Sequence, residues 1–288
     1  MAGVETAETA GFDALVDLVG DGGVVILSGA GISTDSGIPD YRGPSGAALR
    51  RHAPMTYQTF MGDAAARHRY WARSYLGWRH MTGARPNSGH RAVASLQRQG
   101  LLEGVITQNV DGLHQAAGAT GVIELHGGLD RALCLNCGAA ISRADLDRDL
   151  HAVNPDFTAH AEQVNPDGDA ELPEEELDAF TMVPCEVCGD GPLKPDVVFF
   201  GETVPRPRVD TCFELVNRAG SLLILGSSLK VMSGFRFVLH ARKLGIPVAI
   251  VNQGETRGDT HCNIRVDAPL GVVLPALADS LTAKCVIN

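Results

Sequence analysis

Four of the seven cysteines stand in two closely spaced pairs. Cys134 and Cys137 form one Cys-x-x-Cys motif, Cys185 and Cys188 form another, and a glycine directly follows each motif. Such a turn presents two thiolates to one tetrahedral ion, and the glycine relieves the tight backbone behind the second thiolate. Two motifs therefore predict a zinc site of four thiolates, which is structural because no coordination position stays open. The alternative is a redox Cys-x-x-Cys, which usually occurs once and near a βαβ strand.

One histidine is placed to act as a base. His126 lies in the stretch Glu124-Leu-His-Gly127, where a strand is expected to leave the main part of the protein for the cysteine-containing part. An imidazole with an ordinary pKa of about 6.5 exchanges protons near neutral pH. A crevice between two lobes suits a general base, and the alternative is a structural histidine at a domain junction.

Small and amide residues follow four short apolar runs. They are Ser28-Gly-Ala-Gly31, Gln108-Asn109, Gly226-Ser-Ser228 and Asn252-Gln253. Ligands of open α/β sheets bind at the carboxyl ends of the strands, so these residues point to one shared crevice. The first of them resembles a dinucleotide fingerprint without its third glycine, for which the alternative is a tight turn. The amides suit ribose hydroxyls and a carboxamide, and the alternative for them is an Asx turn.

A loop interrupts the helix that an ordinary dehydrogenase would continue after this motif. The residues Asp35-Ser-Gly-Ile-Pro-Asp40-Tyr41-Arg42 combine glycine, proline and charges. We expect them to fold over a bound cofactor, with Arg42 near phosphate and Asp35 near polar groups.

The elements that must position these residues alternate along the chain. Apolar runs at 23–28, 105–107, 221–225 and 247–251 predict strands buried on both faces. Helical patterns cover 90–99, 209–219 and 235–244, and an amphipathic segment lies near 12–19. This alternation predicts an α/β fold with a doubly wound, Rossmann-like parallel sheet.

Two stretches break the alternation and predict a smaller lobe. We assign residues 1–40, 89–130 and 193–288 to the Rossmann-like domain, and residues 41–88 and 131–192 to a lobe with a helical and a four-cysteine module. A helix is expected over 64–80. The acidic connector at 145–178, with Pro and Asp-Gly turns, is expected to be a solvated surface elaboration.

Composition limits the class of protein. The chain has 288 residues and a formal charge of −10, which argues against a general nucleic-acid binder and favours a basic protein substrate. No apolar stretch is long enough for a membrane span, and the first ten residues carry no Lys or Arg, so we expect a cytoplasmic protein. An odd number of cysteines argues against a disulfide framework. Ordinary thiols are expected at Cys212, Cys262 and Cys285.

The order of these motifs resembles the sirtuin family. Gly29-Ala-Gly-Ile-Ser33, Pro39-Asp-Tyr-Arg42, Thr107-Gln-Asn-Val-Asp-Gly-Leu-His114, Glu124-Leu-His-Gly127, the cysteine pairs, Lys194-Pro-Asp-Val-Val-Phe-Phe-Gly-Glu202, Gly226-Ser-Ser228 and Asn252-Gln-Gly254 follow one another as they do in sirtuins. Together they span nearly the whole chain. The wording at 196–200 and the long acidic connector look most like class II, the bacterial and mitochondrial branch.

The resemblance implies an NAD-dependent removal of acyl groups from protein lysines. The bond of NAD to nicotinamide breaks, the acyl oxygen joins the ribose, and a base then activates a ribose hydroxyl, so that O-acyl-ADP-ribose is released. The resemblance assigns catalysis to His126 and Asn109 and places Asp111 with Ile32 at the nicotinamide pocket. We expect His114 to be a packing residue rather than a catalyst. The cofactor-binding residues that the resemblance implies are Gly29, Ala30, Gly31, Ile32, Asp35, Pro39, Asp40, Tyr41, Arg42, Gln108, Asn109, Asp111, His126, Gly226, Ser227, Ser228, Asn252, Gln253, Gly254 and Leu270.

A peptide substrate is expected between two segments. These are 198–202 and the loop 231–234, both extended in pattern, and apolar residues there suit a tunnel for the lysine stem. Tyr70 and Arg73 stand on one face of the helix expected over 64–80. A similar pair in the desuccinylase branch of sirtuins grips an acidic acyl chain, and the alternative is a surface helix. The substrate residues implied are Tyr70, Arg73, Val198, Phe199, Phe200, Gly201, Glu202 and Val231.

Three other functions stay open at this point. A mono-ADP-ribosyltransferase would use the same NAD pocket and leave stably modified protein. A non-catalytic module would bind acyl-lysine or NAD without turnover. A zinc-ribbon nucleic-acid module is disfavoured by the acidic charge.

Overall fold

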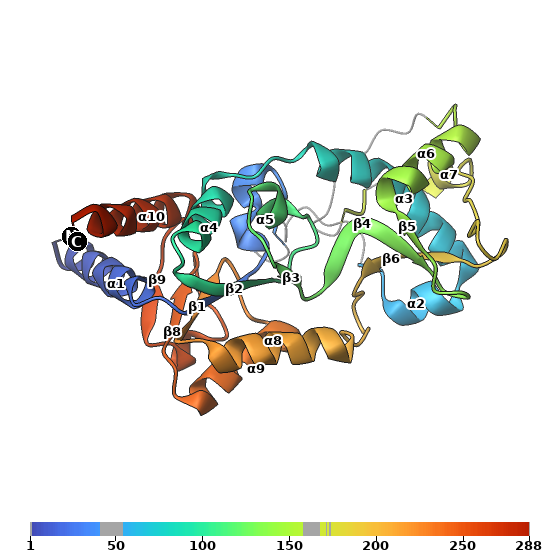
Figure 1. Ribbon diagram of the computed structural model, residues 1–288. Coiled ribbons are helices and arrows are strands. Elements are labelled where there is room, and N and C mark those ends of the chain that lie inside the picture. The colour runs from blue at the N-terminus through green and yellow to red at the C-terminus, as the bar shows by residue number, and fades with distance from the viewer. Residues whose placement is uncertain (1, 41–53, 158–167, 171, 173, 288) are drawn as a thin grey trace.

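The computed structural model describes residues 2–40, 54–157, 168–170, 172 and 174–287 (Figure 1). The predicted Tyr41 and Arg42 lie outside the described residues. Within the described ranges no helix is long and apolar enough to cross a membrane.

A six-stranded parallel sheet forms the larger part of the protein (Figure 1). Its spatial order is β3-β2-β1-β7-β8-β9. This is a doubly wound order, because successive strands are added on one side of β1 up to β3 and on its other side from β7 onward. Four of these strands carry the predicted apolar runs, so the predicted fold class is confirmed. The strands are β1 (Val24–Ser28), β2 (Leu102–Thr107), β3 (Ile123–Glu124), β7 (Ser221–Leu225), β8 (Val248–Val251) and β9 (Ile264–Val266).

Helices cover both faces of this sheet, which explains why its central strands β1, β7 and β8 are buried along their whole length. One face packs on α1 (Ala2–Gly20), α4 (Ser88–Arg98) and α10 (Leu270–Ile287). The other packs on α8 (Arg206–Arg218) and α9 (Met232–Leu244). Short turns follow β1 and β2 at the carboxyl end of the sheet: η1 (Ala30–Ile32), η2 (Thr34–Ser36) and α5 (Leu113–Ala116). Another, η3 (Asp259–His261), precedes β9.

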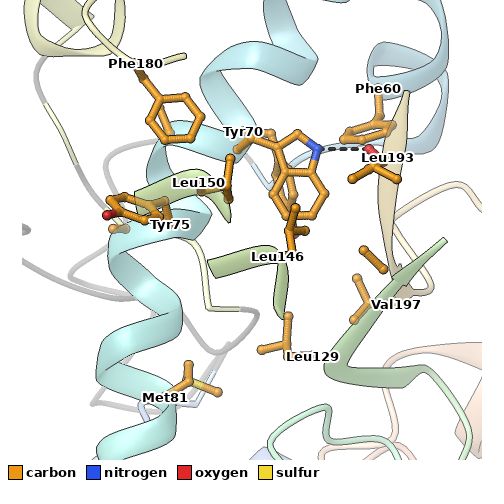
Figure 2. Close-up of a cluster of buried hydrophobic side chains, with 14 of the residues drawn as sticks. Phe60, Tyr70, Tyr75, Met81, Leu129, Leu146, Leu150, Phe180, Leu193 and Val197 are labelled. Carbon is orange, nitrogen blue, oxygen red and sulfur yellow. Dashed lines mark hydrogen bonds between the residues drawn. The ribbon is translucent and has the colours of Figure 1, made fainter. Parts of the chain in front are cut away.

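A second, antiparallel sheet has the order β5-β4-β6, with β4 (Gly127–Cys134), β5 (Ala140–Ser142) and β6 (Leu193–Val197). Its helices are α2 (Tyr57–Gly62), α3 (Ala64–Gly83), α6 (Arg143–Val153) and α7 (Glu174–Leu177). Trp71 of α3 ties the helices to the sheet, since its indole N–H donates to the carbonyl of Leu193 over 2.9 Å (Figure 2). The boundaries assigned to the two lobes stay predictions.

The acidic connector corrects one expectation. It is not only a solvated elaboration, because its described part puts apolar side chains into the core of the smaller sheet. Leu146 and Leu150 lie four residues apart on α6, and both belong to the buried cluster that also contains Tyr70 and Tyr75 (Figure 2). Composition hid this because the charged residues outnumber the few apolar ones that are buried. The buried apolar residues of the connector are Leu146, Leu150, Ala170, Leu172 and Leu177.

The loop expected at 231–234 is also different. α9 begins at Met232, so Val231 alone is extended and acts as the N-cap of the helix. Met232, Ser233 and Gly234 therefore form its first turn. The structure gives no second extended segment there.

Candidate active site

A cavity of about 710 Å³ opens at the carboxyl ends of the parallel strands, beside the neighbouring strands β1 and β7 where the strand order changes direction. It is lined by the loops after β1, β2, β7 and β8, by the segment after β6 and by the start of α9. The predicted residues that line it are Gly29, Ala30, Gly31, Asp40, Gln108, Asn109, Asp111, His126, Val198, Phe199, Phe200, Gly201, Glu202, Gly226, Ser227, Ser228, Val231, Asn252, Gln253 and Gly254.

Two glycines allow the loops after β1 and β7 to touch at the floor of this cavity. A Cβ on Gly31 would lie 2.9 Å from the Cα of Gly226, and Gly226 itself has φ of +59°. Any side chain there would force the loops apart. The short turn η1 that follows leaves backbone facing the cavity, as close approach of a phosphate requires.

His126 lies in the turn between β3 of the large sheet and β4 of the small one, as predicted. Its Nδ1 is 3.0 Å from the carbonyl oxygen of Gln108, and its Nε2 is 2.8 Å from the hydroxyl of Ser233. Because a carbonyl only accepts, Nδ1 carries the proton of the neutral ring and Nε2 keeps the lone pair. Burial lowers the pKa of His126 to about 4, so the ring is neutral at pH 7 and able to accept a proton.

Asn109 and Asp111 are held in place by a network of polar groups beside η1. The Asn109 side-chain amide donates to the Gly29 carbonyl over 3.2 Å and to the Ser33 hydroxyl over 3.0 Å. That hydroxyl donates to the carboxylate of Asp111 over 2.7 Å. Burial raises the pKa of Asp111. Gln108 bridges to the next loop, donating to the Ser227 hydroxyl over 2.9 Å. The amides are thus fixed before any ligand arrives.

A buried ion pair shapes the wall formed by the segment after β6. The ammonium of Lys194 lies 3.0 Å from the Glu202 carboxylate and donates to the Val197 carbonyl over 2.6 Å. Glu202 accepts from the backbone N–H of Phe199 over 2.8 Å, and the ammonium lies 4.5 Å from the centre of the Phe199 ring. Burial lowers the pKa of Lys194, which Glu202 opposes. These contacts hold the segment 197–202 in one conformation.

Lys194→Met is expected to lower the free energy of unfolding by about 3 kcal/mol, because it leaves the Glu202 carboxylate half-buried without its cation. Urea unfolding measures the change. The matched control is Arg218→Met, which breaks an exposed pair with Glu103 and should cost less than about 1 kcal/mol. Equal losses for both variants would show that the Lys194 pair is no more than a surface contact.

Six described residues predicted to bind ligand do not line the cavity. Ile32 and Leu270 are buried behind its floor, and Asp35 lies in a separate shallow hollow beside Arg85 and Arg91. Tyr70 and Arg73 are also buried, so the alternative of a surface helix is wrong for them. Tyr70 reaches the cavity only through Phe199, whose ring it contacts edge-on at 5.2 Å. The six are Ile32, Asp35, Pro39, Tyr70, Arg73 and Leu270.

Several lining residues were not predicted individually. Ile38 and Met55 stand near the ends of the undescribed stretch 41–53, and Lys230, Met232, Ser233, Arg236 and Glu255 flank strand ends or begin α9. The sequence offers only one indication that these residues line the cavity, which is that they lie close along the chain to motifs that were identified. Since α9 was expected to start later, its first turn was read as loop.

The four paired cysteines come together at the far end of the small sheet. Their sulfur atoms all lie within 4.8 Å of one another, with 3.6 Å between those of Cys134 and Cys188 and 3.7 Å between those of Cys137 and Cys185. Four thiolates at about 2.3 Å from one tetrahedral zinc ion are about 3.8 Å apart. The quartet fits one structural zinc ion.

The predicted glycines after each pair have the expected conformation. Gly138 has φ of +72° and Gly189 has φ of +85°, and each donates its N–H to the first cysteine of its pair. Of the remaining thiols, Cys212 is buried and Cys262 half-buried, as expected, and Cys285 has no described side chain.

Two buried histidines behind the cavity are expected to lower the stability of the folded protein as the pH falls. Burial lowers the pKa of His90 to about 3 and that of His114 to about 4, so both are neutral in the folded protein at pH 5. The unfolded chain takes up protons at both as pH falls below about 6.5, so stability is complete above that pH and falls below it. Each contributes about 1.4 kcal/mol per pH unit to the fall.

Urea unfolding at pH 7, 6 and 5 is therefore expected to show a steady fall in the free energy of unfolding. His114→Gln, which keeps a polar group beside the Ser28 hydroxyl, should show a slope smaller by about one proton. Equal slopes for the variant and the parent would mean that His114 is protonated in the folded protein.

Comparison with known proteins gives consistent matches over nearly the whole chain. A family model described as the Sir2 family matches residues 29–233. The NAD-dependent protein deacetylase 1 of Streptomyces coelicolor is 60% identical over 267 residues, which cover 93% of this chain and 89% of that protein. The NAD-dependent protein deacylase Sirt4 of Drosophila melanogaster is 44% identical over 265 residues, covering 91% and 85%. A solved structure described as "Sir2-p53 peptide-NAD+" superposes with a TM-score of 0.73 at 29% identity and covers 96% of this chain and 98% of that one.

Proposed function

The chain belongs to the Sir2 family, and from this premise we propose that it removes acyl groups from protein lysines in a reaction that consumes NAD. The observation that carries the proposal is that His126 and Asn109 line the same cavity as the glycine loops after β1 and β7. The imidazole of His126 and the amide of Asn109 thus face the same cavity as the glycine loops, which leave room for a phosphate to approach closely.

When bound, NAD supplies a ribose whose bond to nicotinamide breaks and whose hydroxyl takes over the acyl group. The residues that would hold its phosphates are Ser227 and Ser228, through their hydroxyls. Gly29 and Gly31 would leave room for close approach, since their own N–H groups donate to the carbonyls of Leu225 and Gly226. Asn252 and Gln253 follow the next strand and would hold the distal ribose. The cavity offers polar groups at the strand ends and apolar ones opposite, which fits a dinucleotide with an alkyl chain beside it.

His126 would act as the general base. Its Nε2 takes the proton of the ribose hydroxyl, and the carbonyl of Gln108 holds Nδ1–H so that the lone pair stays on Nε2. Asn109 orients the ribose, and Asp111 recognises the carboxamide. Val198 and Phe199 line the channel for the lysine stem and exclude water from it.

Identification of the products tests this function. The protein is incubated with NAD and an acetylated peptide, and mass spectrometry follows nicotinamide, the peptide and O-acyl-ADP-ribose. Equal amounts of nicotinamide and unmodified peptide are expected. Stable ADP-ribosylated protein in place of O-acyl-ADP-ribose would favour the transferase alternative, which the relatives' names do not support. No consumption of NAD with any acylated peptide would reject both.

We also propose that acidic acyl groups are accepted. Arg73 is buried, and its Nε has no hydrogen-bond partner among the described residues. Tyr70 packs directly behind the Phe199 ring of the cavity wall. Arg73 stands three residues after Tyr70 on α3, so an acyl chain that passes Phe199 would approach the helix that carries this guanidinium, a group that binds carboxylates well.

The test compares succinyl and acetyl peptides. Arg73→Met is expected to lower the ratio of the succinyl rate to the acetyl rate by about tenfold or more, since a hydrogen bond to a charged group contributes about 1.5–3 kcal/mol. Arg69→Met, on the exposed part of the same helix, is the control and should leave the ratio unchanged. A ratio unaffected by Arg73→Met would remove this arginine from acyl recognition.

A further inference from the structure

A serine hydroxyl is hydrogen-bonded to Nε2 of His126, the ring nitrogen that keeps the lone pair. Ser233 is the second residue of α9, is buried, and places its Oγ 2.8 Å from Nε2 of His126. Because the Gln108 carbonyl fixes the proton on Nδ1, the only arrangement that satisfies both contacts has Ser233 donating to Nε2. Sequence analysis included this serine only within the substrate loop expected at 231–234 and gave it no part in catalysis.

The surroundings of the ring oppose a positive charge. Burial is the main cause of the low pKa of His126, and the guanidinium groups of Arg208 on α8 and Arg236 on α9 lower it further. Among the described residues, the partners of the ring are the Gln108 carbonyl and the Ser233 hydroxyl, with no carboxylate. An imidazolium formed here needs an acceptor at Nε2.

We propose that Ser233 positions the base in both of its protonation states. Its hydroxyl donates to Nε2 while the ring is neutral, and accepts from Nε2–H after the ring has taken a proton. This inference rests on the proposed function. In the step concerned, the O–H bond of the ribose hydroxyl breaks and an N–H bond forms at Nε2, while Ser233 keeps its own proton and only rotates.

The two hydrogen bonds differ in strength. A substrate hydroxyl and Ser233 compete for one lone pair, so Ser233 gives up a neutral hydrogen bond when the substrate approaches. The bond that it then accepts from the imidazolium is charge-assisted and about twice as strong. Ser233 therefore favours proton uptake, although it also occupies the base at rest.

Ser233→Ala separates the steps of the reaction. Nicotinamide release comes before the base acts, so exchange of labelled nicotinamide into NAD should stay within about twofold, while deacylation falls about tenfold. Alanine is tolerated in the first turn of a helix, so α9 should persist. Ser233→Thr restores a hydroxyl and should recover deacylation. Ser95→Ala, which removes a helical serine hydroxyl outside the cavity, is the matched control.

A spectroscopic measurement requires no NAD. In ¹⁵N NMR of the ligand-free protein at neutral pH, the His126 ring, assigned from the His126→Ala spectrum, should show a protonated Nδ1 and a hydrogen-bonded Nε2. Ser233→Ala should move the Nε2 signal to that of a lone pair without a donor and leave Nδ1 protonated, and Ser233→Thr should reverse the change.

Three results would overturn the inference. One is a wild-type ring protonated at Nε2, and another is an Nε2 signal that Ser233→Ala does not move. The third is a Ser233→Ala protein in which exchange and deacylation fall in the same proportion or in which both are unchanged. A serine with a merely structural role would give one of these two results. A wild-type protein without exchange or deacylation would instead reject the proposed function, which keeps the two failures distinct.

Discussion

His126→Ala is expected to lower the turnover of an acylated peptide by about 10²- to 10⁴-fold, the range that a positioned general base contributes. No other histidine lines the described cavity, and Nε2 of His126 keeps the lone pair because the Gln108 carbonyl holds the proton on Nδ1. Exchange of labelled nicotinamide should be much less affected, because it precedes proton removal. Initial rates of deacylation and of exchange, measured on the same preparation, check both parts.

The matched control for this prediction is His240→Ala. His240 lies on α9 as Ser233 does, but bonds to Asn217 outside the cavity. Its removal should leave turnover unchanged. If His126→Ala retained most of the deacylation rate, the proton would be removed by another group, and the assignment of the base to His126 would be wrong.

The fold was predictable because its signals are local and strong. Strands buried on both faces need apolar runs, and each run here stops where small or amide residues begin. Parallel strands bring those ends to one edge, so Gly29, Gln108 and Gly226 could be placed together without knowing any distance. The cysteine pairs were predictable for the same reason, because each pair is a local turn.

The remaining part of the site depends on packing that no local pattern contains. Arg73 stands on a helix with an ordinary mixture of charged and apolar residues, yet it is buried. Ile32 belongs to a cofactor motif but turns its side chain into the core behind the cavity floor. Ser233 meets His126 across more than a hundred residues of sequence, so only the tertiary fold brings them into contact. Spacing alone predicts neighbours along the chain and does not predict which side chain faces a cavity.

The loss of zinc is expected to unfold the smaller sheet and abolish activity, although no cysteine lies in the cavity. The quartet joins the end of β4 to the segment before β6, and Cys134 and Cys185 are part of the hydrophobic core. Binding of a structural zinc ion contributes about 10–16 kcal/mol of apparent free energy, comparable with the whole stability of a domain. Cys137→Ser, or a strong chelator, should therefore lower the thermal midpoint by ten degrees or more and release the metal, as calorimetry and elemental mass spectrometry would measure.

Cys262→Ser is the control for this prediction, since its half-buried thiol donates to the Asp259 carbonyl and serine can do the same. It should keep one zinc ion per chain and the parent's thermal midpoint. The effect of the metal on activity must come through the fold, because four thiolates leave zinc no position for a substrate oxygen. The cavity wall at Phe199 and Glu202 follows directly after β6, a strand of the sheet that the four cysteines hold together. Loss of the metal should therefore displace Phe199 and Glu202 from the cavity. A Cys137→Ser protein that kept the parent's thermal midpoint but lost turnover would contradict a structural metal and place its role in the reaction itself.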